Sequence, residues 1–419
     1  MSSNTREIKD VFYLVALQGI NYVMPLVVFP YLMVTLGAEK FGYIGFATAV
    51  TQYLMLIVDF GFNLSATKRI AIHKENPEKI QEIFWSVLLI KIGLLFISFV
   101  ILLIIAIGIP QFRVYQSTLL IFFLMVVANT FSFVWFFQGL GKIRDVSIVN
   151  VISKLLILPL VFLLVKTNDD YLIAASIQSA VYVLSAVLIV FVLINKKYVP
   201  YWKKPNRNSM IFEIKSASPI FWSNAASSIY VALFAVVLAY FSTAEEVGRY
   251  TAAEKIVRSF CYLIFLPVSQ AFFPKLSALS QSNSAQAGKL MKKISLSVGI
   301  IMLLVFFVLF FFSDYFMLFL GKDYNGIDIV FKIMAIIPFF VALGGVFGQL
   351  GLLALGNEQD KKRYQNVYLI AGVIALVSVF VLTPAFQSIG AATALFATEF
   401  IVFVLMGYFC RNTIRKILV

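Results

Sequence analysis

A chain of 419 residues that is 61% hydrophobic and only 13% charged has too little polar surface to fold as a water-soluble globule. Its formal net charge of +14 could suggest a nucleic-acid partner. However, the Lys and Arg residues gather in connections between long apolar runs, as the positive-inside rule of membrane proteins requires. We therefore exclude nucleic acid, expect membrane lipids as neighbours, and predict an all-α integral membrane protein.

Twelve apolar runs, each long enough to cross a hydrocarbon core of about 30 Å as a helix, fill the chain. The first six predicted transmembrane helices are 11–36, 41–62, 83–109, 117–139, 147–165 and 172–194. The last six are 219–241, 251–273, 294–319, 329–355, 365–384 and 389–410. The first run is too long for the core of a signal peptide, so we expect it to be retained.

Lys and Arg are concentrated in every second connection and at both ends of the chain. Positively charged segments resist export, so this set is predicted to be cytoplasmic, together with both termini. The longest basic connection, from about residue 195 to 215, separates six predicted spans from six. We therefore expect an N-terminal lobe of residues 1–206 and a C-terminal lobe of residues 207–419.

A short motif repeats at the same topological place in each half, directly after its first span. Residues 38–42 read AEKFG and residues 244–248 read AEEVG, an offset of 206 residues. Parallel repeats of this kind are typical of transporters whose halves rock about a central site. The motif predicts two pseudo-symmetric six-helix lobes around a central cavity.

The sequence gives little basis for catalysis. With two Cys and one His it predicts no metal site and no cofactor. It contains no GxxxxGK phosphate loop, so direct nucleotide hydrolysis is not expected. A membrane-embedded polysaccharide polymerase or glycosyltransferase stays a less favoured alternative, because such enzymes usually need a sizeable catalytic loop and the outer loops here are short. We expect no enzyme activity.

Ionisable side chains within the predicted spans indicate a polar interior, because each costs about 2.5–3.5 kcal/mol or more near the bilayer centre unless it faces water or a partner. The acidic candidates, expected to couple ion movement or to form ion pairs, are Asp59, Glu254 and Glu399. The cationic candidates, expected to bind an anionic substrate, are Lys91, Lys154, Lys255 and Arg258. Glu254 and Arg258 stand four residues apart, so a local helical ion pair is the competing interpretation.

Several motifs along the whole chain give it a family likeness: 21–26 (NYVMPL), 59–63 (DFGFN), 66–71 (ATKRIA), 135–139 (WFFQG), 252–258 (AAEKIVR) and 269–275 (SQAFFPK). Together they resemble the Wzx-type O-antigen and lipid-linked oligosaccharide flippases of the multidrug/oligosaccharidyl-lipid/polysaccharide exporter superfamily. The resemblance implies two six-helix lobes that form a V around a cationic cavity. It also implies that Lys255 and Arg258 contact the substrate and that Lys68 and Arg69 lie at the entrance of the cavity.

The resemblance also implies the cargo. An undecaprenyl-pyrophosphate-linked oligosaccharide would move by alternating access from the cytoplasmic to the outer leaflet of the bacterial inner membrane. A polysaccharide polymerase and chain-length proteins would be partners, and a monomer would suffice because one chain holds both lobes. A drug/cation antiporter of the same superfamily is the alternative function. The excess of buried cations counts against it, because such a carrier calls for acidic groups at the deepest positions.

Overall fold

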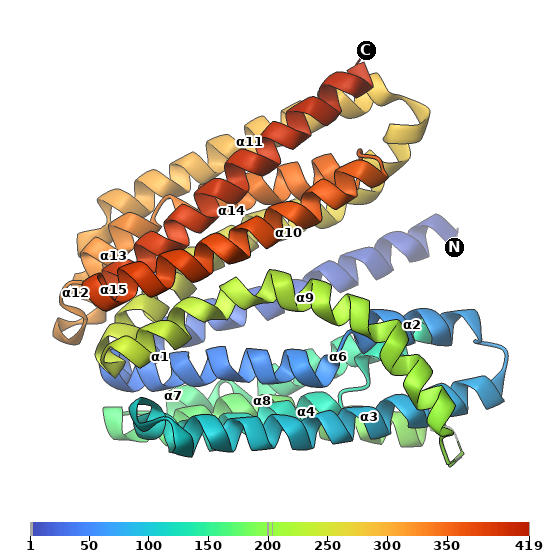
Figure 1. The fold of residues 1–419 in the computed structure, drawn as a ribbon, viewed down its shortest axis with the longest axis horizontal. Helices are drawn as coiled ribbons and strands as arrows, with labels where there is room; N and C mark the ends of the chain where they lie inside the picture. The colour runs from blue at the N-terminus through green and yellow to red at the C-terminus, as the bar shows by residue number, and fades with distance from the viewer. Residues whose placement is uncertain (1–2, 199–200, 203, 419) are drawn as a thin grey trace. The chain divides into compact units, whose positions relative to one another are not determined.

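The computed structural model describes the backbone of residues 3–198, 201–202 and 204–418. Within this range it describes all side chains except those of 3–23, 25, 26, 223, 226–231, 316, 317 and 416–418, so most of the 21–26 motif lies outside the described side chains. Every element in the described part of the chain is helical, which confirms the predicted all-α class (Figure 1). The chain divides into two compact units, and we describe each by itself.

Unit 1 comprises Met1–Leu36 and Phe46–Ser228. It holds most of the first helix and the first part of α9. Its elements are α1 (Ser3–Asp59), α2 (Phe62–Ile72), α3 (Pro77–Leu103), η1 (Ile104–Gly108), η2 (Pro110–Tyr115), α4 (Gln116–Thr130), α5 (Val134–Gly139), α6 (Ile143–Ile157), α7 (Leu160–Leu164), η3 (Asn168–Asp170), α8 (Tyr171–Asn195) and α9 (Arg207–Phe241).

Unit 2 comprises Gly37–Gly45 and Ile229–Val419. It therefore includes the first turns of α1 after the kink, Gly37–Gly45, and the last part of α9. Its other elements are α10 (Ala244–Ser282), α11 (Ser284–Phe311), α12 (Ser313–Leu320), η4 (Lys322–Tyr324), α13 (Ile327–Met334), α14 (Ile337–Gly345), η5 (Val346–Leu353) and α15 (Glu358–Leu418).

Nine helical stretches in the described residues are long and apolar enough to cross a membrane, so the chain is a multi-pass membrane protein. Two of them, Val27–Ile72 and Glu358–Arg415, are 46 and 58 residues long, two to three times the roughly 20 residues that one crossing needs. Each contains a residue with non-helical backbone angles, Gly37 (φ 68°) and Gln387 (φ 50°). Two pairs of predicted spans therefore fall on two kinked helices.

Two helices of unit 1 stop abruptly where the backbone enters the left-handed region. α1 ends at Asp59 because Phe60 and Gly61 have φ values of 42° and 83°. α4 ends at Thr130, and the chain turns through Phe133 (φ 47°) before α5 begins. The predicted span 117–139 is thus interrupted. Phe133 packs into the core against the ring of Phe84, with centroids 5.3 Å apart.

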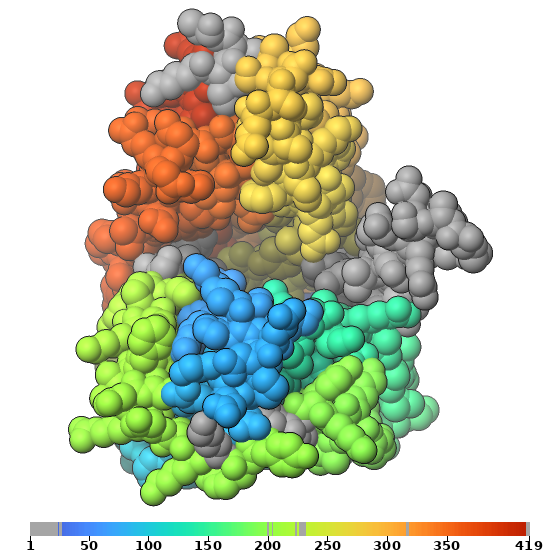
Figure 2. Space-filling model, turned by 90° about the vertical axis from the view of Figure 1, so that its right-hand side faces the viewer, coloured from blue at the N-terminus to red at the C-terminus, as the bar shows by residue number. Residues whose placement is uncertain are grey.

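The second helix of unit 1 is fixed by close packing against α5 and α9. Thr67 Oγ1 donates to the carbonyl oxygen of Trp135 at 2.9 Å, which joins two of the family motifs. At the break after α1, the Phe60 ring stacks on Phe221 of α9 at 4.6 Å. Figure 2 shows the end of α2 (blue) beside the first turns of α9 (yellow-green). This packing positions the basic end of α2.

In unit 2 the two copies of the repeated motif cross at their glycines. A Cβ atom added to Gly42 would lie 1.9 Å from the carbonyl oxygen of Ala244, and one added to Gly248 would lie 1.8 Å from that of Ala38. The contact is reciprocal, because Ala38 corresponds to Ala244 and Gly42 to Gly248 in the repeat. The absence of a side chain at both glycines lets the helix backbones meet directly.

Candidate functional site

Lys91 is the most deeply buried predicted cation, with 1% of its side chain exposed. Its Nζ donates to Asp59 Oδ1 at 3.1 Å and to the carbonyl oxygen of Asn129 at 3.4 Å. Asn129 Nδ2 also donates to Asp59 Oδ1, at 3.0 Å. The two helix breaks create this site, since Asp59 ends α1 and Asn129 lies in the last turn of α4, where a cation is favoured. The structure thus joins two predicted residues, the buried Lys91 and the partly exposed Asp59, in one ion pair.

Beside this pair lies a cavity of about 230 Å³, here called the polar cavity. The last turn of α4 contributes Asn129 and the break after it Ser132. The other polar residues are Asn150 and Lys154 of α6 and Tyr182 and Ser185 of α8. Ser185 Oγ donates to Asn150 Oδ1, which ties α8 to α6. One ammonium, two amides and three hydroxyls can together bind an anion or the hydroxyls of a sugar. The sequence pointed to Lys154, whereas the hydroxyl groups around it carried no distinguishing pattern.

Unit 2 contains a second charged cluster, formed by α10 and α15. Arg258 Nε donates to Glu254 Oε1 at 2.8 Å, which confirms the local i,i+4 ion pair. Glu399, with a buried side chain on α15, interacts electrostatically with Arg258. Arg258 Nη2 is buried and has no hydrogen-bond partner among the described residues. With Lys255 one helical position after Glu254, the cluster balances two cations against two carboxylates, and one guanidinium donor stays available.

At the basic end of α2 the two predicted entrance residues differ. Lys68 is exposed, whereas Arg69 forms an ion pair with the fully buried Glu213 of α9 and stacks on Phe212 at 4.6 Å. Glu213 was not among the predicted site residues. Its signal in the sequence is an isolated acid in a strongly basic connector, just before the predicted span 219–241. Arg69 therefore fastens α9 to α2.

Stability should depend on pH through Glu213. Burial raises the pKa of this carboxyl group to about 7, with Arg69 opposing and Glu82 adding to the shift. Between its ordinary pKa of 4.5 and about 7, the folded protein keeps a proton that the unfolded chain releases. The free energy of unfolding should therefore fall, by a few kcal/mol at most, as pH rises through this window, and level off above it. Thermal unfolding measured from pH 5 to pH 8 should show the decrease, and Glu213→Gln should flatten it; an equally steep decrease in that variant would contradict the assignment.

Removing one partner of the Lys91–Asp59 pair should destabilise the protein. Asp59→Asn leaves the buried ammonium without its carboxylate, at an expected cost of about 3–5 kcal/mol. The double variant Asp59→Asn/Lys91→Met removes both charges and should recover most of that loss. Detergent-solubilised yield and thermal unfolding would measure both variants. Equal stability of the single and double variants would show that the pair does not hold unit 1 together.

Comparisons with known proteins find a matching family and two curated relatives along most of the chain. The family model "Polysaccharide biosynthesis protein" matches residues 8–280. A "Putative O-antigen transporter" of Escherichia coli (strain K12) is 32% identical over 418 residues, 98% of both chains. Another, of Shigella dysenteriae, is 26% identical over 404 residues, 95% of this chain and 98% of the relative.

Two solved structures share the fold at low sequence identity. An inward-facing multidrug resistance MATE family transporter of the MOP superfamily gives a TM-score of 0.75 at 13% identity, over 94% of this chain and 95% of that one. The inward closed lipid II flippase MurJ gives 0.74 at 15% identity, over 97% and 90%. At these identities the likeness concerns the fold alone.

Proposed function

We propose that this chain flips an undecaprenyl-pyrophosphate-linked oligosaccharide. The premise is that the chain belongs to the polysaccharide biosynthesis protein family and is a Wzx-type member of the MOP exporter superfamily. As a lipid-linked polysaccharide flippase it is a multi-pass protein of the bacterial inner membrane. The cargo moves from the cytoplasmic to the outer leaflet and is an O-antigen or a related repeat unit.

The observation that carries this proposal is the polar cavity within the apolar helices of unit 1. A pyrophosphate diester brings about two negative charges, which cannot enter hydrocarbon without compensation. Lys154 supplies a cation at the cavity wall, and the amides and hydroxyls of Asn129, Asn150 and Ser185 match the hydrogen-bonding groups of a sugar. A carrier of drug cations would instead place carboxylates at such a point.

In unit 2 we assign Arg258 and Lys255 to the pyrophosphate. The available Nη2 donor of Arg258 supports this role, because a guanidinium engaged by one carboxylate still has donors for a phosphate. Lys91 acts differently: its charge is already paired with Asp59, so it holds the broken ends of α1 and α4 in place. Lys68, exposed on α2, meets the anionic headgroup at the cavity entrance.

The same cluster offers a route to ion coupling. When the pyrophosphate engages Arg258, Glu254 and Glu399 lose part of their compensating charge, and proton uptake by one of them becomes favourable. Release of the cargo reverses the exchange. Asp59 is a less favoured coupling group because Lys91 stays beside it. Transport that responds to a pH gradient in the wild type and no longer does so in Glu399→Gln is the result this coupling requires.

For the transport cycle we propose twelve transmembrane helices in two six-helix lobes, 1–206 and 207–419, that alternate access to a central cavity, with both termini cytoplasmic. The kinks at Gly37 and Gln387 support the span count, because each divides a helix of double length. A single chain suffices for this cycle. A polymerase and chain-length proteins would receive the cargo on the outer side.

Expression in a bacterium that lacks its own lipid-linked oligosaccharide flippase tests the function. Return of surface glycan is the expected result. Absence of glycan despite correct membrane insertion, combined with no retention of undecaprenyl pyrophosphate by the purified protein, would refute the function. Export of a cationic dye by the same cells would favour the antiporter instead.

A further inference from the structure

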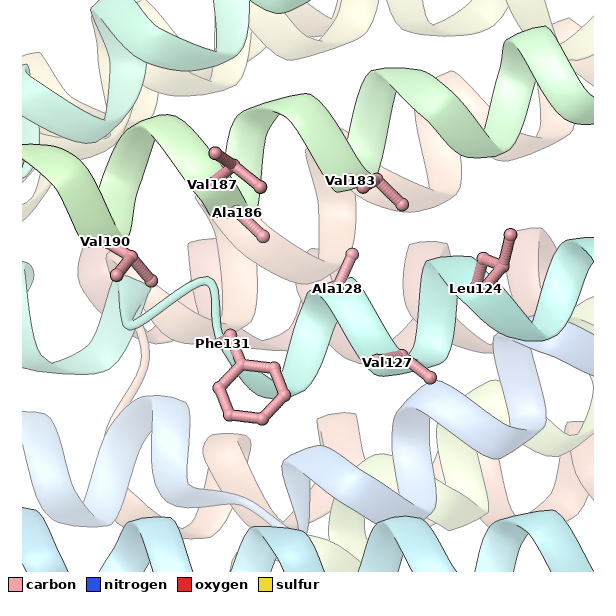
Figure 3. A pocket seen from close by; sticks show the side chains of 8 residues that line it. All are labelled: Leu124, Val127, Ala128, Phe131, Val183, Ala186, Val187 and Val190. Carbon is pink, nitrogen blue, oxygen red and sulfur yellow. The ribbon is translucent and has the colours of Figure 1, made fainter.

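An apolar groove of about 360 Å³ runs along α4 and α8 in unit 1 (Figure 3). All eight side chains that line it are hydrocarbon, and they come from these two helices and from Phe131, just after α4. Leu124, Val183 and Val187 are among its exposed residues, so the groove is open at the protein surface. In a membrane protein such a surface is accessible to lipid chains.

The groove borders the polar cavity. Ala128 lines both: it faces the groove with Val127 and Phe131, and the cavity with Asn129 and Ser132. α8 likewise alternates between the two, with Val183 and Val187 in the groove and Tyr182 and Ser185 in the cavity. The apolar groove and the polar cavity are therefore neighbours, and the residue between them, Ala128, has only a methyl group as its side chain.

We propose that this groove binds the phosphate-proximal isoprenoid units of the cargo's polyprenyl chain while the pyrophosphate enters the polar cavity beside Lys154. The inference rests on the proposed function and adds where the lipid part of the cargo is held. Apolar lining suits the chain, and the ammonium of Lys154 suits the pyrophosphate. The cargo is then recognised by its junction between lipid and phosphate, which is independent of its sugars.

The volume of the groove suits part of one hydrocarbon chain. At about 360 Å³ the groove is at the small end of ligand-binding pockets, so the specificity for the cargo comes from the neighbouring ammonium of Lys154 and not from the groove alone. The hydrogen bond from Ser179 Oγ to the Ile121 carbonyl oxygen, 3.0 Å long, joins the same two helices. α4 and α8 are thereby held together where the chain is to lie.

Val187→Trp tests the groove and Phe191→Trp is its matched control. Both residues lie on α8, one turn apart, and both are 58% exposed, but only Val187 lines the groove. The purified variants would be incubated with undecaprenyl pyrophosphate, undecaprenol or phosphatidylglycerol, and retained lipid measured by native mass spectrometry. Lys154→Gln is the third variant, because it removes the charge and keeps the side-chain polarity.

We expect Val187→Trp to lower retention of both undecaprenyl pyrophosphate and undecaprenol about tenfold, and Phe191→Trp to leave both near wild type. Lys154→Gln should lower retention of the pyrophosphate and spare uncharged undecaprenol. Equal retention of the polyprenyl lipids by Val187→Trp and Phe191→Trp would refute polyprenyl binding in the groove. Competition by phosphatidylglycerol that is as strong as competition by the polyprenyl lipid would refute it too. If the wild type restores surface glycan and either of these results is found, only the lipid-binding role of the groove is rejected. If the wild type fails to restore glycan or to retain undecaprenyl pyrophosphate, the proposed function is rejected.

Discussion

Replacing Arg258 by Gln should lower transport of the lipid-linked glycan at least about tenfold, a loss of about 1.4 kcal/mol or more in stabilisation of the bound cargo. Arg258 is the guanidinium of the unit 2 cluster, and its buried Nη2 donor has no partner among the described residues. Gln cannot provide the charge or the fork of donors that a phosphate accepts. Arg258→Lys should retain part of the activity, because it keeps the charge. The flipping rate of the wild type and of both variants would be measured with purified protein in proteoliposomes.

A loss of folding could imitate this result, because Arg258→Gln removes the ion-pair partner of the largely buried Glu254 and part of the charge that compensates the buried Glu399. The fourfold variant Glu254→Gln/Lys255→Gln/Arg258→Gln/Glu399→Gln removes all four charges of the cluster together. It should insert and unfold like the wild type and still fail to transport. Wild-type transport by the fourfold variant would show that the cluster is structural and not a substrate contact.

Adding one methyl group where the repeated motifs cross should have the second large effect. In Gly42→Ala or Gly248→Ala the new Cβ would come within 1.9 or 1.8 Å of a backbone carbonyl oxygen, whereas real contacts are essentially never closer than 3.0 Å. The helix backbones must then separate by about an ångström, at an expected cost of about 1–3 kcal/mol or more. Both variants should unfold at a lower temperature than the wild type and lose transport.

Gly93→Ala provides the control, because a Cβ added there meets nothing within 4 Å. Because Ala has a higher helix propensity than Gly, this substitution should leave the free energy of unfolding unchanged or raise it by up to about 1 kcal/mol. Unit 2 carries its own probes, since the free thiols of Cys261 and Cys410 are both buried and become reactive on unfolding. A maleimide dye would report the transition in each variant. Gly248→Ala unfolding at the same temperature as Gly93→Ala would refute the close crossing.

The sequence predicts the helical class well because apolar run length and charge placement are local properties of the chain. The crossing of 38–42 and 244–248 could also be expected, since repeated glycines at matching positions permit close backbone approach. The breaks at Phe60 and Phe133 could not, because neither residue ordinarily favours a positive φ. Tertiary packing of aromatic rings imposes those breaks.

The pairing of charges between different helices was equally inaccessible from one sequence. Glu254 and Arg258 lie one turn apart on one helix, so their ion pair could be predicted. Lys91 and Asp59 are 32 residues apart, and Arg69 and Glu213 are 144 apart, on different helices. Each partner is brought in by a helix break or by the packing of α9. The grouping of side chains around Lys154 in the polar cavity was inaccessible for the same reason, since four helices supply its lining.

An assay of purified protein in proteoliposomes decides whether this chain flips an undecaprenyl-pyrophosphate-linked oligosaccharide. A fluorescent glycan label would be quenched from outside by a membrane-impermeant reductant, so that the protected fraction reports the inner leaflet. Protection should be lost with wild-type protein and should persist with the fourfold variant of Glu254, Lys255, Arg258 and Glu399. Protection that persists equally with wild-type protein and with empty liposomes would contradict the proposed function.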